Sequence, residues 1–501
     1  MSTGYVHGAY GNLGESVVSN ASTASTAPLI VGTAPVNLIR NYEKADIINN
    51  PVRLSNIGAK EIIGYSKDWN NFTLSEVLDA FFNNEKGNVG PIYVINVLNP
   101  DIHRKSEQTT KSLTFTNGTA LIESDTIILD TFALDDKVEG VDYNLSYNMN
   151  TGKAVISSVD NSNKLKGTIS ASYYDVDTSL VTEENIIGKV SEEGVYTGLQ
   201  AGKKLHPLMN VITNILLIPK WSEIPAVYEA MVEFSQKING HWFAFPLADI
   251  PVKDGSNAVD TISKAKEWAK NNGYNSFYSK VFWPKTKTNS GKIFNLSSVA
   301  AVEMLRTDSS HDGVPMESCS NKTIPVAAQY FGDSSKNQGF DQDKANELNE
   351  VGITTLVAWG GTYVLWGPHT AGFEAGEDGN AKDDIDPLAI FDVNIRMQEY
   401  ILNHFQEKWG STVDAPLDIN LRDTILEEEQ QFLDSLVAIG ALIGNPTVEF
   451  IESENSTSDI MNGNFKWNFS STPTPPAKAL KAEVTYTDAG FTTFFGEESE
   501  E

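Results

Sequence analysis

The sequence predicts a multidomain protein of the α/β (α+β) class. It is expected to have a mixed α/β core, a C-terminal α/β domain, an inserted all-β module and extended strand arms at both ends. Three observations lead there: 501 residues suffice for about three domains, strand-length apolar runs alternate with amphipathic helical stretches, and a stretch of short alternating strands interrupts them. Because 40% of the residues are hydrophobic, each domain can bury a core, and disorder of the whole chain is excluded.

The chain begins with a segment that offers little to bury. Residues 1–27 are rich in Gly, Ser, Thr and Ala, which predicts an N-terminal arm. Residues 28–32 and 91–98 are apolar runs typical of buried strands, and apolar residues recur at helical spacing from Thr73. This β-α-β pattern predicts the first part of the α/β core over residues 28–104.

A different pattern fills residues 105–185. Short alternating stretches are broken there by Asn-Gly, Glu-Gly and Thr-Gly, which favour tight turns. The predicted strands include 113–116, 126–129, 142–147 and 154–157. The segment is therefore expected to be an all-β module inserted into the α/β domain.

The α/β pattern returns over residues 186–340. One helix is expected after Ser222 and another over 264–271, and the strands predicted around them cover 211–218, 242–247 and 277–283. Alternation of this kind predicts a mainly parallel sheet with right-handed crossovers.

Residues 341–471 are expected to form the C-terminal domain. It begins with a helix over 343–350 and a strand over 353–359, and a further helix follows Arg396.

The strongest helical pattern of this domain starts near Thr424. Glu427, Glu428 and Glu429 are expected in its first turns, where the helix dipole favours negative charge. Gly440 and Gly444 mark its end.

The last segment, residues 472–501, is predicted to be a second arm. The sequence Thr-Pro-Thr-Pro-Pro at 472–476 is typical of a stiff spacer. Beyond it, apolar and polar residues alternate as in a strand, the apolar ones being Leu480, Ala482, Val484 and Tyr486.

An apolar strand with unpaired backbone groups is an aggregation liability, so something must cover this arm. It is expected to add to a sheet of a neighbouring copy or, as the alternative, to fold back on its own domain. Arms at both ends would favour an open helical assembly over a closed dimer.

Composition and charge exclude several function classes. The net charge of −29 would repel nucleic-acid phosphates and anionic lipids. The N-terminus lacks the basic and apolar regions of a signal peptide, and no apolar run approaches the roughly 20 residues of a membrane span. Neither a nucleic-acid partner nor a membrane span is therefore expected.

The usual catalytic motifs fail on spacing. The sequence contains no GxxxxGK[ST] loop, no HExxH, no GxSxG and no paired CxxC, and its seven histidines never fall at metal-ligand spacing. No catalytic residue, cofactor or metal is therefore predicted. An α/β enzyme whose site is assembled from distant residues stays open as an alternative.

Four features are given structural interpretations. Cys319 is expected to be a buried small apolar residue and not a nucleophile, and His404 a hydrogen-bonded core or interface histidine. Asp341-Gln342-Asp343 is expected to be an acidic helix N-terminus and not a calcium loop, and the acidic residues of 377–386 a solvated loop and not a cation site.

Leu348-Asn349 with Gly352-Ile353, and Trp366-Gly367 with Thr370, form two short motifs, and these resemble the C-terminal signature of contractile phage tail sheath proteins. Residues 346–355 contain an "LN..GI" turn, and residues 360–370 contain a "WG.RT" segment in which His369 stands where many relatives carry arginine. The residues that carry this signature are Leu348, Asn349, Gly352, Ile353, Trp366, Gly367 and Thr370.

Further segments resemble the same family in the same order. Residues 27–34 are similar to its first strand, 139–143 to the "G.DY" turn of its β module, and 391–396 to a following strand that carries Arg396. Residues 8–10 are similar to its N-terminal arm, for which Tyr5, His7 and Tyr10 are the expected inter-subunit residues.

The resemblance implies a structural, non-enzymatic subunit. Such proteins form hexameric rings stacked helically around a tail tube from a baseplate to a terminator, in a virion tail or tail-like particle assembled in the bacterial cytoplasm. The C-terminal domain is expected to face the tube and the β module to face outward. The sequence does not distinguish a phage tail from a headless bacteriocin, and another self-assembling surface or tube protein stays open as a third alternative.

Overall fold

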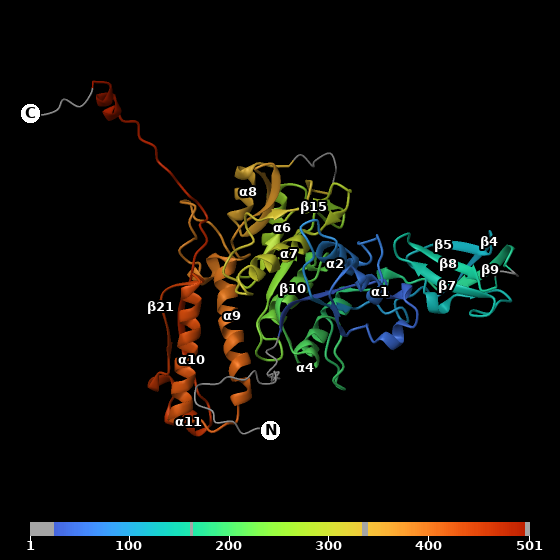
Figure 1. The fold of residues 1–501 in the computed structure, drawn as a ribbon, viewed down its shortest axis with the longest axis horizontal. Helices are drawn as coiled ribbons and strands as arrows, with labels where there is room; N and C mark the ends of the chain where they lie inside the picture. The colour runs from blue at the N-terminus through green and yellow to red at the C-terminus, as the bar shows by residue number, and fades with distance from the viewer. Residues whose placement is uncertain (1–24, 161–163, 333–338, 496–501) are drawn as a thin grey trace, which may run out of the picture. The chain divides into compact units, whose positions relative to one another are not determined.

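The computed structural model describes residues 25–160, 164–332 and 339–495, and contact clustering divides the chain into two compact units. The first unit comprises the residues up to 246 with 401–415, and the second comprises 247–400 with the residues from 416 onward. Figure 1 shows the described elements in chain order. Tyr5, His7 and Tyr10, predicted for the N-terminal arm, lie outside the described residues.

The first unit contains four neighbouring strands in the order β10-β1-β3-β2. β1 pairs in parallel with both β10 and β3, whereas β2 pairs antiparallel with β3. The strands predicted from the two apolar runs and the helix predicted from Thr73 are confirmed. The bounds are β1 (Ser25–Gly32), β2 (Pro51–Leu54), α2 (Thr73–Phe82), β3 (Ile92–Asn96) and β10 (Val211–Leu217).

The inserted segment forms two three-stranded antiparallel sheets, β4-β9-β6 and β5-β8-β7. Both lie in the first unit and are drawn in cyan in Figure 1. Their bounds are β4 (Thr109–Phe115), β5 (Thr119–Glu123), β6 (Ala133–Leu134), β7 (Tyr143–Asn148), β8 (Lys153–Ser158) and β9 (Gly167–Tyr173).

The strand predicted over 126–129 is wrong. Ile127 makes an isolated bridge to Asp175, and a 3-10 turn covers Leu129–Thr131. The three apolar residues of this run are each at most 1% exposed: Ile127, Ile128 and Leu129. The run is therefore buried on all sides and does not alternate between a buried and an exposed face as the predicted strand would.

Short helices complete the first unit. The helix predicted after Ser222 is confirmed as α5 (Pro225–Ser235), which has proline at its start, as the fixed φ of proline allows. The other helices are α1 (Lys60–Ile63), α3 (Glu183–Ile187) and α4 (Leu205–Met209).

The second unit contains five neighbouring strands in the order β17-β20-β19-β14-β11. β11, β14 and β19 pair in parallel, and β20 and β17 extend them antiparallel. The predicted strand over 353–359 is confirmed, whereas those over 242–247 and 277–283 begin three residues later. The bounds are β11 (Phe245–Asp249), β14 (Lys280–Phe282), β17 (Thr323–Ile324), β19 (Ile353–Trp359) and β20 (Thr362–Trp366).

Smaller strands and three helices surround this sheet. The helices predicted over 264–271 and 343–350 are confirmed as α6 (Ile262–Asn271) and α8 (Gln342–Asn349). The remaining elements are β12 (Lys253–Asp254), β13 (Asn257–Ala258), β15 (Lys285–Lys287), β16 (Ile293–Phe294), α7 (Leu296–Ser309) and β18 (Ala328–Tyr330).

Arg396 lies in a helix and not in the strand expected over 391–396. α9 covers Asp392–Trp409. Val393, Met397 and Ile401, spaced four residues apart along this helix, are at most 1% exposed. The helical spacing of these buried residues therefore overrides the strand that the family resemblance implied.

The strongest helix begins earlier than predicted. α10 covers Ile419–Ala438 and is capped by Asp418, which accepts a hydrogen bond from the Leu421 amide at 2.8 Å. Glu427, Glu428 and Glu429 therefore lie in the middle of the helix, and the predicted dipole interaction in its first turns is wrong. After α10 come β21 (Leu442–Glu449), α11 (Thr457–Met461) and β22 (Asn468–Pro473).

None of the helices in the described ranges combines the length and the apolar character that crossing a membrane requires.

Candidate functional site

The signature residues are brought together at the junction of α8, β19 and β20. The Asn349 side-chain amide donates to the carbonyl oxygens of Ile353 and Trp366, at 2.9 and 3.0 Å. Leu348 and Ile353 are buried below the junction, and the Trp366 indole donates to Asn346 at 3.0 Å. The "LN" turn thus ties the helix to the start of one strand and the end of the next.

Two glycines of the signature allow a close approach of backbones. A Cβ on Gly352, whose φ is +73°, would lie 2.5 Å from the Thr370 carbonyl oxygen. A Cβ on Gly367, whose φ is +135°, would lie 2.8 Å from the Asn349 amide nitrogen. Glycine is therefore required by both conformation and space.

A buried ion pair lies directly beneath the signature. Lys280 Nζ lies 2.8 Å from Asp392 Oδ2, and both side chains are fully buried. The same ammonium donates to the carbonyl oxygens of Gly367 and His369, at 2.8 and 3.0 Å. Its three donors are therefore all used, which is what makes a buried charge tolerable.

Arg396, the last signature residue, belongs to the same buried region. Its guanidinium pairs with the carboxylate of Asp308, at the end of α7, and both side chains are at most 5% exposed. Arg396 therefore fixes α9 to α7, a structural function that the helix prediction alone would not reveal.

Burial shifts the pKa values of three groups in this region. It raises the pKa of Glu399 to about 8, an effect that nearby Arg396 opposes only in part. It lowers the pKa of His369 to about 3 and raises that of Cys319 to about 12. His369 is therefore neutral near pH 7, and Cys319 is the buried, unreactive thiol predicted from sequence.

His369 fills a slot between two aromatic rings. Its ring stacks on Phe373 at a centroid distance of 3.5 Å and on Phe391 at 5.2 Å, and its Nδ1 lies 2.7 Å from the Ile390 carbonyl oxygen. Thr370, the next signature residue, donates from its hydroxyl to the Ala389 carbonyl oxygen. At this position the side chain serves packing inside its own unit.

A second feature of the same unit is a ribbon of two antiparallel strands, β21 and β22. Each strand is the only strand partner of the other in the described part of the chain, so neither outer edge pairs with a further strand. The register shifts between Ile443 and Thr447, where Gly444-Asn445-Pro446 forms a bulge. An isolated two-stranded ribbon is only marginally stable in water, so this one depends on its support.

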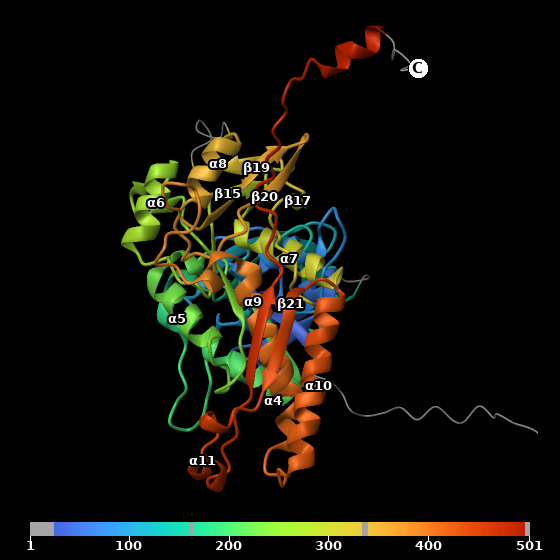
Figure 2. The same cartoon turned by 90° about the vertical axis from the view of Figure 1, so that its left-hand side faces the viewer.

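The ribbon rests on side chains of α9 and α10. Gln430 uses both atoms of its side-chain amide on β21: Nε2 donates to the Pro446 carbonyl oxygen at 3.0 Å, and Oε1 accepts from the Val448 amide at 3.2 Å. Gln398 donates to the Ser471 hydroxyl at 3.0 Å. Figure 2 shows the two strands side by side, with α10 next to β21.

The C-terminal arm follows directly from β22 and is exposed. Leu480, Val484 and Tyr486 are 90%, 93% and 79% exposed, and Ala482 is exposed as well. Residues 474–488 form neither helix nor strand, and a 3-10 turn, η12 (Ala489–Phe495), follows them. Figures 1 and 2 draw this arm in red, unpaired with any strand of its own chain.

The arm carries a second apolar feature that the strand pattern did not reveal. Phe491 and Phe494 are 53% and 79% exposed, and their ring centroids lie 6.0 Å apart. Their spacing of three residues brings them onto one side of a 3-10 turn, which a search for period-two alternation misses.

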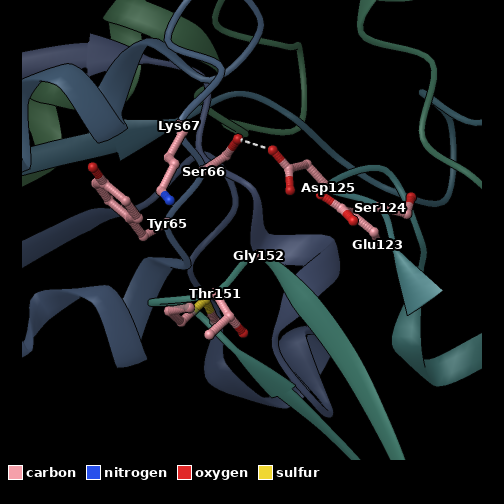
Figure 3. A pocket seen from close by; sticks show the side chains of 9 residues that line it. Tyr65, Ser66, Lys67, Glu123, Ser124, Asp125, Thr151 and Gly152 are labelled. Carbon is pink, nitrogen blue, oxygen red and sulfur yellow. Dashed lines mark hydrogen bonds between the residues drawn. The ribbon is translucent and has the colours of Figure 1, made fainter. Parts of the chain in front are cut away.

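The first unit contains a cavity of about 350 Å³. Figure 3 shows its lining from the loop 65–67, from the end of β5 with the residues that follow it, and from the turn between β7 and β8. The Asp125 carboxylate is occupied on both oxygens, by the Ser66 hydroxyl and by Tyr147, whose hydroxyl donates at 2.9 Å. The Asp125 carboxylate thus joins the β module to the loop 65–67.

The two acidic clusters have structural functions. Asp341 caps α8 by accepting from the Lys344 amide at 3.1 Å, which confirms the predicted helix N-terminus. Asp378 accepts from the backbone and side chain of Asn380, at 3.0 and 2.7 Å, within a solvated loop. Among the residues that the structure describes, no three His, Cys, Asp or Glu side chains are grouped so that they could hold a metal ion.

Comparison with known proteins supplies the context for these features. No protein-family model matches the chain. The tail sheath protein of Burkholderia phage BcepMu is 25% identical over 513 residues, covering 99% of this chain and all of the phage protein. The tail sheath protein of Escherichia phage P2 is 24% identical over 324 residues, covering 63% of this chain and 74% of its own length.

The homologues of this chain are contractile tail sheath proteins. A solved structure with a similar fold is the helical sheath of the anti-feeding prophage in its contracted state. It aligns with a TM-score of 0.51 and 14% identity over 96% of this chain and all of that chain. The mixed α/β fold with several sheets is thus a sheath protein fold.

Burial and contacts separate the predicted residues into two groups. Leu348, Asn349, Gly352, Ile353, Trp366, Gly367, Thr370 and Arg396 lie inside one unit and stabilise it. Leu480, Ala482, Val484 and Tyr486 make no such contacts and are exposed. Sequence reasoning missed the ribbon because Gly444-Asn445-Pro446 interrupts the alternation of β21.

Proposed function

We propose that this chain is the structural subunit of a contractile tail sheath. Copies form hexameric rings that stack helically around a tail tube, between a baseplate and a terminator, in a virion tail or a tail-like particle. Contraction of this lattice drives the tube through a bacterial envelope. The particle is assembled in the bacterial cytoplasm, with the C-terminal domain toward the tube and the β module outward.

The exposed C-terminal arm is the observation that carries this proposal. Leu480, Val484 and Tyr486 form an apolar row that nothing in the chain's described part covers. The outer edge of β22 in the β21–β22 ribbon, in turn, pairs with no strand in the described part of the chain. An arm and an open edge on every copy are complementary, because a strand from one copy can add to the sheet of the next.

The same geometry fits mechanical work. Main-chain ladders between copies would survive while folded bodies rotate and slide, so the lattice stays connected during contraction. The energy is then stored in subunit contacts and is released when a poorer set of rigid-body interfaces is exchanged for a better one.

A pair of single substitutions in the arm tests the proposal. Val484→Asp places a charge in the apolar row, whereas Thr485→Asp places the same charge on the alternate, polar face. We expect Val484→Asp to abolish polymers, because a buried unpaired carboxylate is costly, and Thr485→Asp to retain them. Negative-stain electron microscopy measures the outcome as hollow cylinders or discrete particles.

Deletion of residues 479–501 is the corresponding large change. It should leave folded subunits that no longer polymerise. Normal cylinders from the deletion variant would refute the arm's part in assembly, and discrete globular oligomers from the native chain would refute the sheath function itself.

A further inference from the structure

The linker between β22 and the C-terminal arm is held at two points on its own subunit. The first is Thr474, whose amide donates to the Ala441 carbonyl oxygen at 3.0 Å and whose hydroxyl donates to that of Gly440 at 2.7 Å. These carbonyls follow the end of α10, where backbone acceptors lack helical partners. The second point is Lys478, four residues further on.

Lys478 reaches across to the loop between β20 and α9. Its Nζ donates to the Gly379 carbonyl oxygen at 3.0 Å and lies 5.9 Å from the centroid of the Phe373 ring. The residue's own backbone is turned as well, since its amide donates to the Pro476 carbonyl oxygen at 2.8 Å. A hydrogen bond and a cation–π contact thus hold one ammonium group.

The acceptor loop is itself well fixed. Gly379 donates to the Gly376 carbonyl oxygen at 3.0 Å, and Gly376 donates to that of Asn380 at 2.7 Å. Lys382 pairs with Glu374 at the base of the loop. The carbonyl that Lys478 binds is therefore presented by a closed turn.

Gly379 and Phe373 together form the binding seat of Lys478, and the Phe373 ring belongs to the signature region. Phe373 is 3% exposed and lies parallel to His369, with an interplanar angle of 4°. His369 is held in turn by Phe391 and by the Ile390 carbonyl oxygen. The stack that begins inside the unit thus ends at the lysine that precedes the arm.

We propose that Lys478 is a positioning residue for the arm: by binding Gly379 and Phe373 it fixes the point and direction at which residues 479–495 leave their own subunit. The inference rests on the proposed function, because the positioned arm is the one offered to a neighbouring copy. It assigns to the signature region a part in assembly, as the base of the seat, in addition to stabilising its own unit.

The expected size of the effect follows from chain length. With Lys478 bound, the free chain up to residue 488 is residues 479–488; with Lys478 released, it is residues 475–488, since Thr474 still holds. The free length grows from ten to fourteen residues, and effective concentration falls roughly as the −3/2 power of length, which gives about a twofold loss. A released linker also leaves the subunit in no fixed direction, which adds to this loss. The critical concentration for polymers should therefore rise about 2- to 5-fold in total.

Three substitutions test this by assembly. Lys478→Met removes the charge and keeps the length, Lys478→Arg keeps a donor and a cation, and Lys481→Met is the matched control on an exposed lysine of the arm. We expect the critical concentration for polymers, measured by sedimentation, to rise about 2- to 5-fold in Lys478→Met. Lys478→Arg should recover most of this loss, and Lys481→Met should match the native chain.

A second readout follows the contact without assembly. Dyes on Ala482→Cys and Asp383→Cys report the distance from the arm to the acceptor loop, and buried Cys319 does not compete for labelling. Single-molecule energy transfer, measured far below the polymerisation concentration, should shift in Lys478→Met and return in Lys478→Arg. An unchanged distribution in Lys478→Met would overturn the inference.

The outcomes separate this inference from the proposed function. If Lys478→Met assembles like the native chain while Val484→Asp fails, the arm is required but Lys478 does not position it. If Val484→Asp also assembles normally, the proposed use of the arm fails, and the energy-transfer result alone decides whether Lys478 holds the linker.

Discussion

The signature region and the C-terminal arm, both in the second unit, use their apolar and polar groups in opposite ways. Around Lys280 every donor is satisfied inside the unit, and Gly352 permits a backbone approach that no other residue would. Along the arm, Leu480 and Val484 are at least 90% exposed and no ladder is formed. The first region forms a stable body, whereas the second leaves apolar side chains exposed, as the proposed pairing with another copy requires.

This comparison predicts that variants of the two regions fail differently. Substitutions in the body should lower the free energy of unfolding, while those in the arm should leave it nearly unchanged and act on polymers alone. Val484→Asp should therefore keep the native melting temperature even though it blocks assembly, since exposed substitutions change stability by about 0.5 kcal/mol or less.

The largest loss of stability is expected from Asp392→Asn. It leaves the Lys280 charge buried without its counter-ion, which costs about 3–5 kcal/mol. Chemical denaturation measures this loss. The matched control is Glu454→Gln, which breaks the exposed pair with Lys466 and should cost about 1 kcal/mol or less; equal losses would contradict the assigned importance of burial.

A smaller loss is expected from Gly352→Ala. The left-handed φ of +73° costs about 1–2 kcal/mol for an L-residue, and the close approach to Thr370 adds to it, giving about 2–4 kcal/mol. Gly440→Ala is the control, because its φ is +80° but nothing lies within 4 Å of the added Cβ. The difference between the two variants isolates the steric term.

Glu399→Gln should change how stability depends on pH. The folded pKa of about 8 lies above the ordinary value of 4.5, so between these pH values the folded state holds the extra proton and stability falls as pH rises. At pH 8 the variant should be more stable than the native chain by on the order of 4 kcal/mol, and at pH 5 by about 1 kcal/mol or less. Exposed Glu427→Gln should show no such dependence.

The smallest effect is expected from salt. Subunits with a net charge of −29 repel one another unless opposite charges meet across their contacts, so polymer formation should respond to ionic strength while the unfolding transition shifts little. Light scattering from 0.05 to about 0.5 M salt measures this. Identical assembly at every salt concentration would show that charge repulsion between subunits does not affect polymer formation.

The body was largely predictable where a pattern is long and local. The strand Ile353–Trp359 and the helix start at Thr73 were located to the residue, because buried runs and helical spacing leave few alternatives. Errors arose where a family resemblance implied a strand inside a helical period, as at Arg396, or where polar residues concealed a helix start, as at Asp418.

The contacts that matter most were not predictable. Lys280 meets Asp392, and Arg396 meets Asp308, only because the fold brings distant segments together, and neither pair has a spacing that a sequence can reveal. The arm is the reverse case. The alternation along the arm was visible in the sequence because it is a local pattern. The contact of Lys478 with Gly379 was not, because these residues lie far apart in the sequence.

The bulge in β21 makes the two edges of the ribbon unequal. Pro446 has no amide hydrogen and Gly444-Asn445-Pro446 bends β21, whereas the proline of β22, Pro473, lies at the end of that strand. An added strand would therefore have a longer run of backbone partners beside β22 than beside β21, where Gln430 also binds Pro446 and Val448. In the proposed lattice, addition of a strand to β22 would thus be favoured over addition to β21, and the contact between copies would have a fixed polarity.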